Sequence, residues 1–413
     1  MTRIPTPQPG AESEWVRATL AHLACDDVGA SSRFRGTQAT ADAMLASLDV
    51  TGYAGSRSEV YPVAERGASG LSPYLRHGLL TLPQVWDAVS GAPSKDRQKF
   101  RDELLWQEYA RHVYARLGGR NRTGLRFEPT IDRHDDTTGH DEPTGRHDPW
   151  DRSMACIDAV VDELERDGWL VNQTRMWLAS HWAVRHGADW RVGEDRFFTH
   201  LLDGSRAANR LGWQWTIGSG TGKPYGFSRW QVEKRAPGLC DSCELQANCP
   251  VDDWPDDRTL DPVPTQDLLR SDPDPSATAG PIATITAGEP AAVWITAESL
   301  GDIDPAMTAH ADLPVVFVFD ESLLARLQLS SKRLVFIAER LAELGTQRDL
   351  EVHLGDPVTV LEGRPLATTF APVPGWRARS RRLDLAATHP WPWLRRPNNG
   401  PIQSFSAWRK SLS

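Results

Sequence analysis

The stretch Pro314–Asp356, PVVFVFDESLLARLQLSSKRLVFIAERLAELGTQRDLEVHLGD, decides the fold class of the C-terminal half of the chain. It begins with PVVFVFD and ends with LEVHLGD, two short β-rich runs. Between them, Leu323–Gly345 carries apolar residues at helical spacing and predicts a single amphipathic helix. A strand, a helix and a strand in this order are typical of a small parallel α/β domain.

The segments upstream of this stretch suggest where that domain begins. The run AAVWIT (Ala291–Thr296) is a further short strand, and no GxGxxG loop follows it, which argues against a classical dinucleotide site. Residues 255–290 are rich in Pro, Asp, Thr and Ala without sustained periodicity, and predict a linker. We therefore expect a domain at 1–254, a linker at 255–290, and an α/β domain at 291–413 that ends in a basic tail, for which a solvated face is the simplest interpretation.

The N-terminal half has a different pattern. Lys99–Leu117 (KFRDELLWQEYARHVYARL) and Met154–Trp169 (MACIDAVVDELERDGW) repeat apolar residues at three and four, which predicts a mainly α domain. Since 413 residues exceed the usual size of a single core, two domains are expected.

Composition limits the function classes. No apolar run approaches the roughly 18 to 20 residues that a membrane span needs, and the opening residues lack a signal-peptide core, so a cytoplasmic protein is expected. The net charge of −9 argues against a surface that coats nucleic acid throughout, but it leaves room for a local basic groove.

Four of the five cysteines can be grouped. Cys240, Cys243 and Cys249 form CDSCELQANC, and Cys156 lies upstream near the start of a predicted helix. A CxxC turn lets two thiolates bind one centre, and zinc and an iron–sulfur cluster both fit this set, whereas a disulfide is disfavoured in a cytoplasmic chain. Cys25 stands apart and is expected to be a small buried residue.

The most distinctive segment is Gly168–Tyr225, GWLVNQTRMWLASHWAVRHGADWRVGEDRFFTHLLDGSRAANRLGWQWTIGSGTGKPY. It resembles the FAD-site core of photolyases and cryptochromes, which follows the pattern GWxHNRxRM, DWRxGE and LxDGDxAxNxGGWQW. Tyr53–Arg57, Ser69–Gly78 and Asp102–Trp106 precede it in the order typical of that family. The resemblance covers roughly residues 38–250 and implies a helical FAD-binding domain of photolyase/cryptochrome type.

The resemblance also implies a set of FAD contacts. A turn at Ser69 and Ser72 can place hydroxyls against a diphosphate. The carboxylate of Asp203 can accept from flavin N3–H, and the amide of Asn209 can lie near N5. The family usually has a second Asp at the position of Ser205. The full implied set is Tyr53, Ser69, Gly70, Leu71, Ser72, Arg175, Asp203, Ser205 and Asn209.

A lesion pocket is implied as well. Glu103 and Trp106 are three apart on one predicted helix and share a face, although an exposed face is the simpler interpretation from that helix alone. In repairing members such residues hold a flipped pyrimidine dimer by hydrogen bonds and stacking. The implied catalytic set is Glu103, Trp106, Asn172, Met176, Arg57 and Trp215. Asn172 stands where iron–sulfur members usually carry His, which leaves cyclobutane and 6-4 lesions both open.

Two further features follow from the resemblance. Trp213 and Trp190 match members of the family's electron-transfer chain, and Trp182, Trp177 and Trp230 are candidates for a third. In the iron–sulfur branch, one Cys precedes the GW segment and three follow the flavin core. Cys156, Cys240, Cys243 and Cys249 stand in those places, so the resemblance implies a 4Fe–4S cluster.

The order of the domains departs from the family. AAVWITAESLGDIDP and LPVVFVFDESLL resemble the first strands of the family's N-terminal α/β domain, yet they begin after residue 290. We therefore expect a circular permutation. The usual Arg residues after the first strand are missing and the domain has only about 120 residues, which argues against an antenna chromophore.

The functional hypothesis is a blue-light-dependent DNA photolyase that acts on UV-damaged DNA, with no membrane partner. Reduced FAD would donate an electron to the lesion and recover it after bond cleavage, while the protein flips and orients the base. The alternatives are a cryptochrome-like photoreceptor and a flavoprotein in which FAD and the cluster are only structural.

Overall fold

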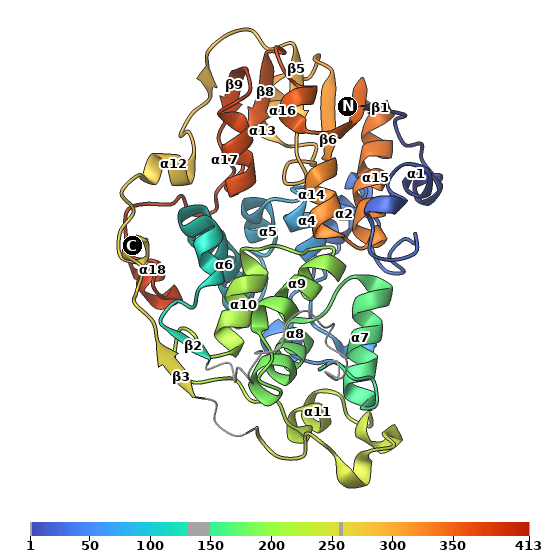
Figure 1. The fold of residues 1–413 in the computed structure, drawn as a ribbon, viewed down its shortest axis with the longest axis vertical. Helices are drawn as coiled ribbons and strands as arrows, with labels where there is room; N and C mark the ends of the chain where they lie inside the picture. Colours follow the sequence, from blue (N-terminus) through green and yellow to red (C-terminus); the bar gives the residue numbers. More distant parts are fainter. Residues whose placement is uncertain (1, 130–148, 256–258, 413) are drawn as a thin grey trace, which may run out of the picture.

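The computed structural model describes residues 2–129, 149–255 and 259–412. A seven-stranded sheet forms one end of the molecule, and helices form most of the rest (Figure 1). Across the sheet the strands are β1 (Thr2–Ile4), β7 (Leu350–Gly355), β6 (Val315–Asp320), β5 (Ala292–Ile295), β8 (Leu366–Thr369), β9 (Leu385–His389) and β4 (Ile285–Thr286). The five inner strands are parallel and the two edge strands antiparallel. Counted from β5, the inner strands lie in the order third, second, first, fourth and fifth, a Rossmann-like arrangement that confirms the predicted α/β region.

The two faces of the sheet enter different cores. Val293 and Ile295 belong to the large core that also contains the helices of the N-terminal half. Their neighbour Trp294 points to the opposite face, where it packs in a smaller core with Trp376 of α17 (Pro374–Ser380). Alternate residues of a strand point to opposite faces, so β5 is buried on both sides. One face of the sheet therefore shares a continuous core with the helical region.

The predicted single helix at Leu323–Gly345 is wrong. The structure has α14 (Glu321–Leu327) and α15 (Ser331–Gly345), separated by Gln328 in a left-handed conformation at φ 45°. Apolar spacing continues through the break, which is why periodicity alone did not show it. Serines after Gln328 favour a turn because their hydroxyls compete for backbone hydrogen bonds.

The helical region confirms the predicted helices at Lys99–Leu117 and Met154–Trp169, which lie within or around α6 and α7. Its helices are α2 (Gln38–Ala46), α3 (Tyr53–Ser56), α4 (Ser72–Arg76), α5 (Leu82–Ala88), α6 (Ser94–Leu117), α7 (Ala155–Asp167), α8 (Asn172–Ser180), α9 (Trp190–His200), α10 (Ala208–Thr216) and α11 (Arg229–Arg235). Among the residues that the structure describes, none of the helices is both long enough and apolar enough to span a bilayer.

Both ends of the chain pack on the region built by the other half of the sequence. At the N-terminus, β1 joins the sheet beside β7, and α1 (Glu12–Thr19) lies along α15 (Figure 1). At the C-terminus, α18 (Phe405–Lys410) packs on α6, where the indole of Trp408 donates to His112 Nδ1 at 2.9 Å. The C-terminal segment is thus packed onto the helices through Trp408, while its basic residues Arg409 and Lys410 are exposed.

The segment expected as a linker contains short elements. Its β3 (Leu260–Pro262) pairs with β2 (Phe127–Pro129), α12 (Pro275–Ala279) approaches α6, and β4 closes one edge of the sheet. The limits 1–254, 255–290 and 291–413 remain predictions of domain organisation.

Candidate functional site

The predicted flavin contacts centre on the turn between α9 and α10. Arg175 of α8 donates from Nη2 to Asp203 Oδ2 at 2.7 Å, and from Nε to the carbonyl of Leu170 at 3.0 Å. The Ser205 hydroxyl accepts the backbone N–H of Ala207 at 3.3 Å. The side chain of Ser205 is therefore used to start α10, while Arg175 fixes the orientation of the Asp203 carboxylate.

Two polar atoms on this turn lack partners. Asp203 Oδ1 and Asn209 Nδ2 are both buried, and neither has a hydrogen-bond partner within the described residues. Leaving a buried acceptor or donor unpaired costs about 1–3 kcal/mol each. These are the two side chains expected to face the isoalloxazine ring, and their unpaired atoms fit the polar edge of a flavin.

Two arginines that the sequence did not single out hold the same turn. Arg333 of α15 donates from Nη2 to the carbonyl of Gly204 at 2.7 Å, and Arg76 of α4 donates from Nε to the same oxygen at 2.8 Å. Burial, and next the charge of Arg76, lowers the pKa of Arg333 to about 9. The α/β region thus contributes a buried cation to the support of the turn that is predicted to face the flavin.

The predicted diphosphate side lies at the start of α4. Gly70 has φ 70°, a left-handed conformation that favours glycine. The Ser69 hydroxyl accepts from Leu71 N–H at 3.4 Å, and the Ser72 hydroxyl accepts from the indole N–H of Trp169 at 2.9 Å. The structure therefore brings Ser69, Gly70, Leu71 and Ser72 together in one turn.

Tyr53, in α3, packs against Phe100 of α6 with ring centroids 5.0 Å apart. Burial, and next the charge of Glu103, raises the pKa of Tyr53. Its phenol therefore stays protonated and can donate a hydrogen bond.

The predicted lesion contact Glu103 is already paired with the protein's own cations. Glu103 Oε1 lies 2.8 Å from Lys99 Nζ and 3.5 Å from Arg57 Nε. Its side chain is 35% exposed, so Glu103 lies neither on a fully exposed helix face nor deep in a pocket. The structure does bring Arg57 and Glu103 together, as predicted.

Trp106 is covered by the C-terminal helix. The ring of Phe405 stacks on it with centroids 4.0 Å apart and planes 9° from parallel. Arg409 of the same helix forms an ion pair with Asp102 at 2.9 Å. One face of the indole expected to stack on a base is thus occupied by a side chain of the same chain.

The remaining predicted lesion contacts lie on α8 and α10. Asn172 is exposed at the start of α8, and Met176 is half-buried one turn later. Trp215 of α10 is 44% exposed and lies 5.5 Å from the ring of Tyr225. Because α10 packs against both α6 and α8, Trp215 lies on the helix between the predicted contacts on α6 and those on α8.

A row of buried aromatic rings runs from α10 through α9 to Trp150, which precedes α7, and on to Trp182, which follows α8. Trp213 contacts Phe197 at 5.2 Å, Phe197 contacts Trp150 at 5.3 Å, and Trp150 contacts Trp182 at 5.1 Å. A Cβ on Gly193 would lie 2.2 Å from Trp213 and 3.0 Å from Trp182, so both indoles reach the same point. Trp182, one of three candidates, therefore lies in this row, and Trp150 was missed because it lies outside the recognisable motifs.

The other candidate tryptophans lie elsewhere. Trp190 is buried and donates to Glu128 at 3.4 Å, Trp177 packs on Phe227, and Trp230 is 57% exposed. The roles predicted for Trp213 and Trp190 remain predictions.

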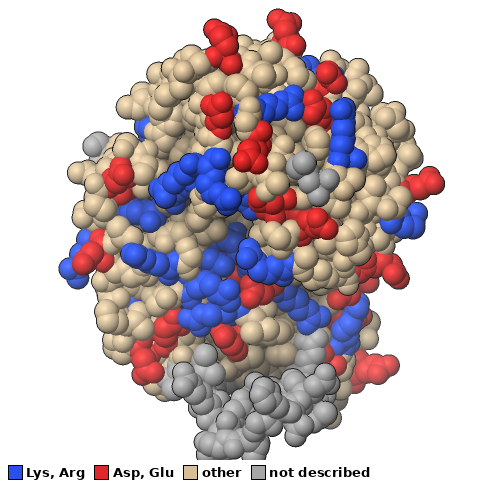
Figure 2. Space-filling model, turned by 45° about the horizontal axis from the view of Figure 1, so that its top comes forward, with Lys and Arg blue, Asp and Glu red and all other residues tan. Residues whose placement is uncertain are grey.

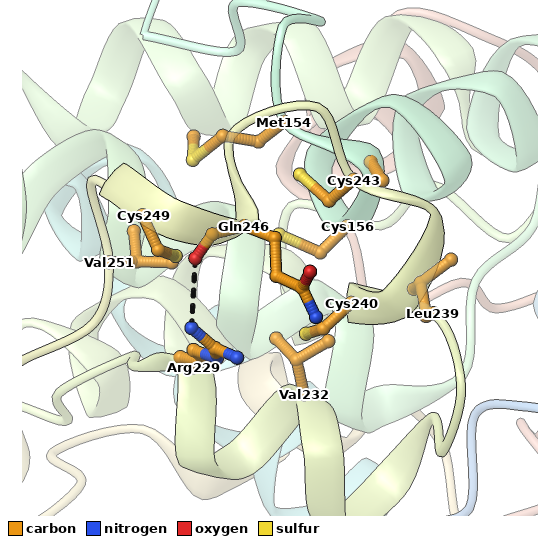
Figure 3. Close-up of a pocket in the computed structure, with 11 residues that line it drawn as sticks. Met154, Cys156, Arg229, Val232, Leu239, Cys240, Cys243, Gln246, Cys249 and Val251 are labelled. Atoms are coloured by element: carbon orange, nitrogen blue, oxygen red, sulfur yellow. Dashed lines mark hydrogen bonds between the residues drawn. The ribbon is translucent and has the colours of Figure 1, made fainter.

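The four grouped cysteines surround one pocket (Figure 3). Cys156 comes from the first turn of α7, and Cys240, Cys243 and Cys249 from the irregular segment after α11. The hollow has a volume of about 340 Å³, part of it open to solvent, and Met154 and Val251 also line it. Burial, and next the neighbouring thiols, raises the pKa of Cys156 to about 12. An uncoordinated Cys156 would stay a thiol, whereas a metal would deprotonate it.

Positive charge is gathered locally on the surface. Figure 2 shows Lys and Arg side chains around a hollow near the middle of one face, with acidic side chains scattered around them. The net charge of −9 is therefore unevenly distributed.

The comparisons agree with this geometry. Residues 100–234 match the family described as the FAD binding domain of DNA photolyase. The deoxyribodipyrimidine photo-lyase of Synechococcus sp. is 31% identical over 178 residues, which cover 38% of this chain and 34% of that protein. The photo-lyase of Vibrio cholerae is 32% identical over 180 residues, which cover 39% and 35%. The chain spans about a third of the length of these curated relatives.

A solved cryptochrome of Synechocystis sp. matches 50% of this chain and 44% of its own, at 21% identity and a TM-score of 0.42. Residues 100–234 of the chain are therefore similar to the FAD-binding domain of DNA photolyases. This match confirms the predicted resemblance over that segment, and the structure confirms the predicted helical domain beside a parallel sheet.

Proposed function

We propose that this protein is a blue-light-dependent flavoprotein that repairs UV-damaged DNA as a deoxyribodipyrimidine photolyase. The observation that carries the proposal is the pair of buried, partnerless atoms Asp203 Oδ1 and Asn209 Nδ2 on a turn fixed by Arg175, as far as the described residues go. This turn lies in the segment that matches the FAD binding domain.

The protein's own groups would bind and orient FAD. Asp203 Oδ1 would accept from the flavin imide, Asn209 Nδ2 would donate near its central ring, and the Ser69–Ser72 turn with Tyr53 would hold the diphosphate. When bound and reduced, FAD supplies the light-driven electron. Arg76 and Arg333 would keep the turn in place by sharing the Gly204 carbonyl.

The DNA side of the proposal rests on Glu103 and Trp106. Glu103 could exchange Lys99 or Arg57 for a base edge, since partly exposed ion pairs are worth only about 0–1 kcal/mol. Trp106 and Trp215 offer stacking surface, and the basic hollow in Figure 2 would attract the phosphate backbone. For Trp106 to stack on a base from the side of Phe405, α18 would have to move.

We also propose that Cys156, Cys240, Cys243 and Cys249 hold a 4Fe–4S cluster. In the described part of the chain, no three of these sulfurs lie within 4.8 Å of one another. One zinc ion with bonds of about 2.3 Å would draw its sulfurs to about 3.8 Å apart. In a four-iron cluster each thiolate binds a different iron, so wider spacing around a hollow favours the cluster.

The domain order supports a circular permutation, which remains part of the proposal. The central strand β5, the first strand of the parallel set, follows the FAD-binding segment in sequence.

One experiment tests the function directly. The purified protein would be illuminated with blue light in the presence of DNA with defined cyclobutane or 6-4 lesions, and lesion loss measured against a dark control. Light-dependent loss of either lesion supports the proposal. Flavin photoreduction without loss of either lesion would refute repair.

The second candidate is a signalling photoreceptor that does not repair DNA. It is favoured by the stacking of Phe405 on Trp106, which occupies part of the lesion surface. In limited proteolysis, release of α18 would appear as a new cleavage site after Ile402. Its appearance only after blue-light reduction of the flavin would support this function.

A further inference from the structure

A second group of metal-ligand side chains lies apart from the cysteine pocket. Cys25, Asp26 and His200 bring a sulfur, a carboxylate oxygen and an imidazole nitrogen within 4.8 Å of one another. None of these residues belongs to the predicted flavin, lesion or cluster sets. Cys25 was expected to be buried, but the structure shows it exposed.

Backbone hydrogen bonds from three separate segments position the group. The N–H of Cys25 donates to the carbonyl of Leu329 at 3.2 Å, and the N–H of Ser330 donates to the carbonyl of Thr199 at 2.9 Å. The unpredicted break between α14 and α15 thus ties the N-terminal segment to the end of α9. His200, which follows Thr199, is held beside Cys25 and Asp26 by this arrangement.

The polar atoms of the group retain unused bonding capacity. Asp26 Oδ2 accepts from the Ser330 hydroxyl at 2.6 Å and Lys332 Nζ at 3.1 Å. Oδ1 accepts from Ser331 N–H at 2.6 Å, and a carboxylate offers about four lone-pair sites in total, so one remains on Oδ1. His200 Nδ1 is buried and, counting described residues alone, has no hydrogen-bond partner.

We propose that Cys25, Asp26 and His200 bind a divalent transition-metal ion of the zinc class, with water as the fourth ligand. A thiolate and an imidazole select such an ion over magnesium or calcium, which prefer oxygen ligands. Bonds of about 2.0–2.3 Å place tetrahedral ligands about 3.3–3.8 Å apart, so the side chains need only small shifts. The exposed Cys25 provides the entry path.

The charges of the site set its expected strength. The Cys25 thiolate and the Asp26 carboxylate would balance the two positive charges of the ion. The ammonium of Lys332 beside Asp26 opposes binding, so the site is weaker than one closed by four cysteines.

The site lies where it can influence the flavin-facing turn. His200 ends α9, and Asp203 follows three residues later. A bound ion would link the N-terminal segment to the end of α9, and Asp26 already holds the start of α15 through Ser330 and Ser331. It would therefore stabilise the packing of the sheet region on the helical region.

The test uses the full chain and Zn²⁺ as the probe. Zinc per chain would be measured by elemental analysis after dialysis, and alkylation of Cys25 would be followed by peptide mass spectrometry with and without Zn²⁺. In the wild-type protein we expect about one zinc per chain at this site and at least about tenfold slower alkylation of Cys25, because a coordinated thiolate is withdrawn from reaction. Cys25→Ser and His200→Gln should each abolish zinc binding here, and His200→Gln should remove the protection.

The matched control is Cys243→Ser, which alters the other cysteine set and should leave Zn²⁺ protection of Cys25 intact. Unchanged alkylation of wild-type Cys25 on adding Zn²⁺ would refute the site. Equal zinc content in Cys25→Ser and wild type, with zinc lost only in Cys243→Ser, would assign the zinc to the other pocket and also refute it. If His200→Gln does not fold, Cys25→Ser still decides the question, because an exposed thiol contributes little to the core.

Discussion

The turn proposed to face the flavin and the surface proposed to face a lesion lie on neighbouring helices, yet they differ in how their polar and aromatic groups are satisfied. On the turn, Asp203 and Asn209 are buried and each keeps an atom without a partner in the described structure. On the surface, Glu103 is paired with two cations and Trp106 is stacked on Phe405. The buried atoms of the turn are left for an outside polar group, whereas Glu103 and Trp106 are held by groups that a ligand would have to displace.

The largest effect is expected at Asp203. In Asp203→Ala the flavin loses a charged acceptor and Arg175 loses its buried partner, so FAD affinity should fall about 100-fold, or about 2.7 kcal/mol. Titration of the apoprotein with FAD, followed by flavin fluorescence, measures this. Asp195→Ala is the control, because Asp195 is 42% exposed and its partner Arg206 keeps a second carboxylate, that of Glu194. Unchanged FAD binding by Asp203→Ala would contradict the view that this turn is the flavin site.

The next effect concerns the aromatic row behind the turn. Trp213→Phe and Trp150→Phe should each slow blue-light reduction of bound flavin by roughly tenfold, equivalent to about 1.4 kcal/mol in the barrier. Trp190→Phe serves as the comparison, since the ring contacts that join Trp213, Phe197, Trp150 and Trp182 do not include it. Photoreduction rates under constant illumination give the answer. A larger loss in Trp190→Phe than in Trp150→Phe would show that electrons follow another route.

On the lesion side, removing the stacked ring should increase binding. An aromatic pair is worth about 0.5–1.5 kcal/mol, so Phe405→Ala should raise the affinity for UV-irradiated DNA between about twofold and tenfold. Fluorescence anisotropy with irradiated and intact DNA measures the change. Ser406→Ala, at the exposed neighbouring position, should have no effect. If Phe405→Ala weakens binding, Phe405 takes part in binding DNA and does not compete with it.

The sequence predicted the local elements well and the long-range contacts poorly. Periodicity predicts the strands PVVFVFD and LEVHLGD and the helices around Lys99–Leu117 and Met154–Trp169. These elements could be predicted because the pattern of each lies within its own segment. The edge strand β1 has three residues and pairs with β7, so its own sequence is too short to predict a strand.

In the candidate site, the residues within sequence motifs could be predicted, whereas the long-range contacts could not. Motif positions located Asp203, Asn209 and the four cysteines, which the structure brings into one turn and one pocket. Arg333 reaches Gly204 from 129 residues away, and Phe405 reaches Trp106 across most of the chain. Such contacts depend on how the sheet and the C-terminus pack, which spacing along the sequence does not encode.

The smallest effect is expected from Glu103→Gln, and it separates stability from function. Glu103 is 35% exposed and its ion pairs with Lys99 and Arg57 are screened by solvent, so the free energy of unfolding should fall by less than about 1 kcal/mol. Asp203→Asn should cost more, because Asp203 is 6% exposed and holds Arg175. Denaturant unfolding of both variants beside the wild type makes the comparison. A loss above about 2 kcal/mol in Glu103→Gln would mean that the Glu103 carboxylate stabilises the fold. Its ion pairs with Lys99 and Arg57 would then be no easier for a ligand to replace than the ion pair of Asp203 with Arg175.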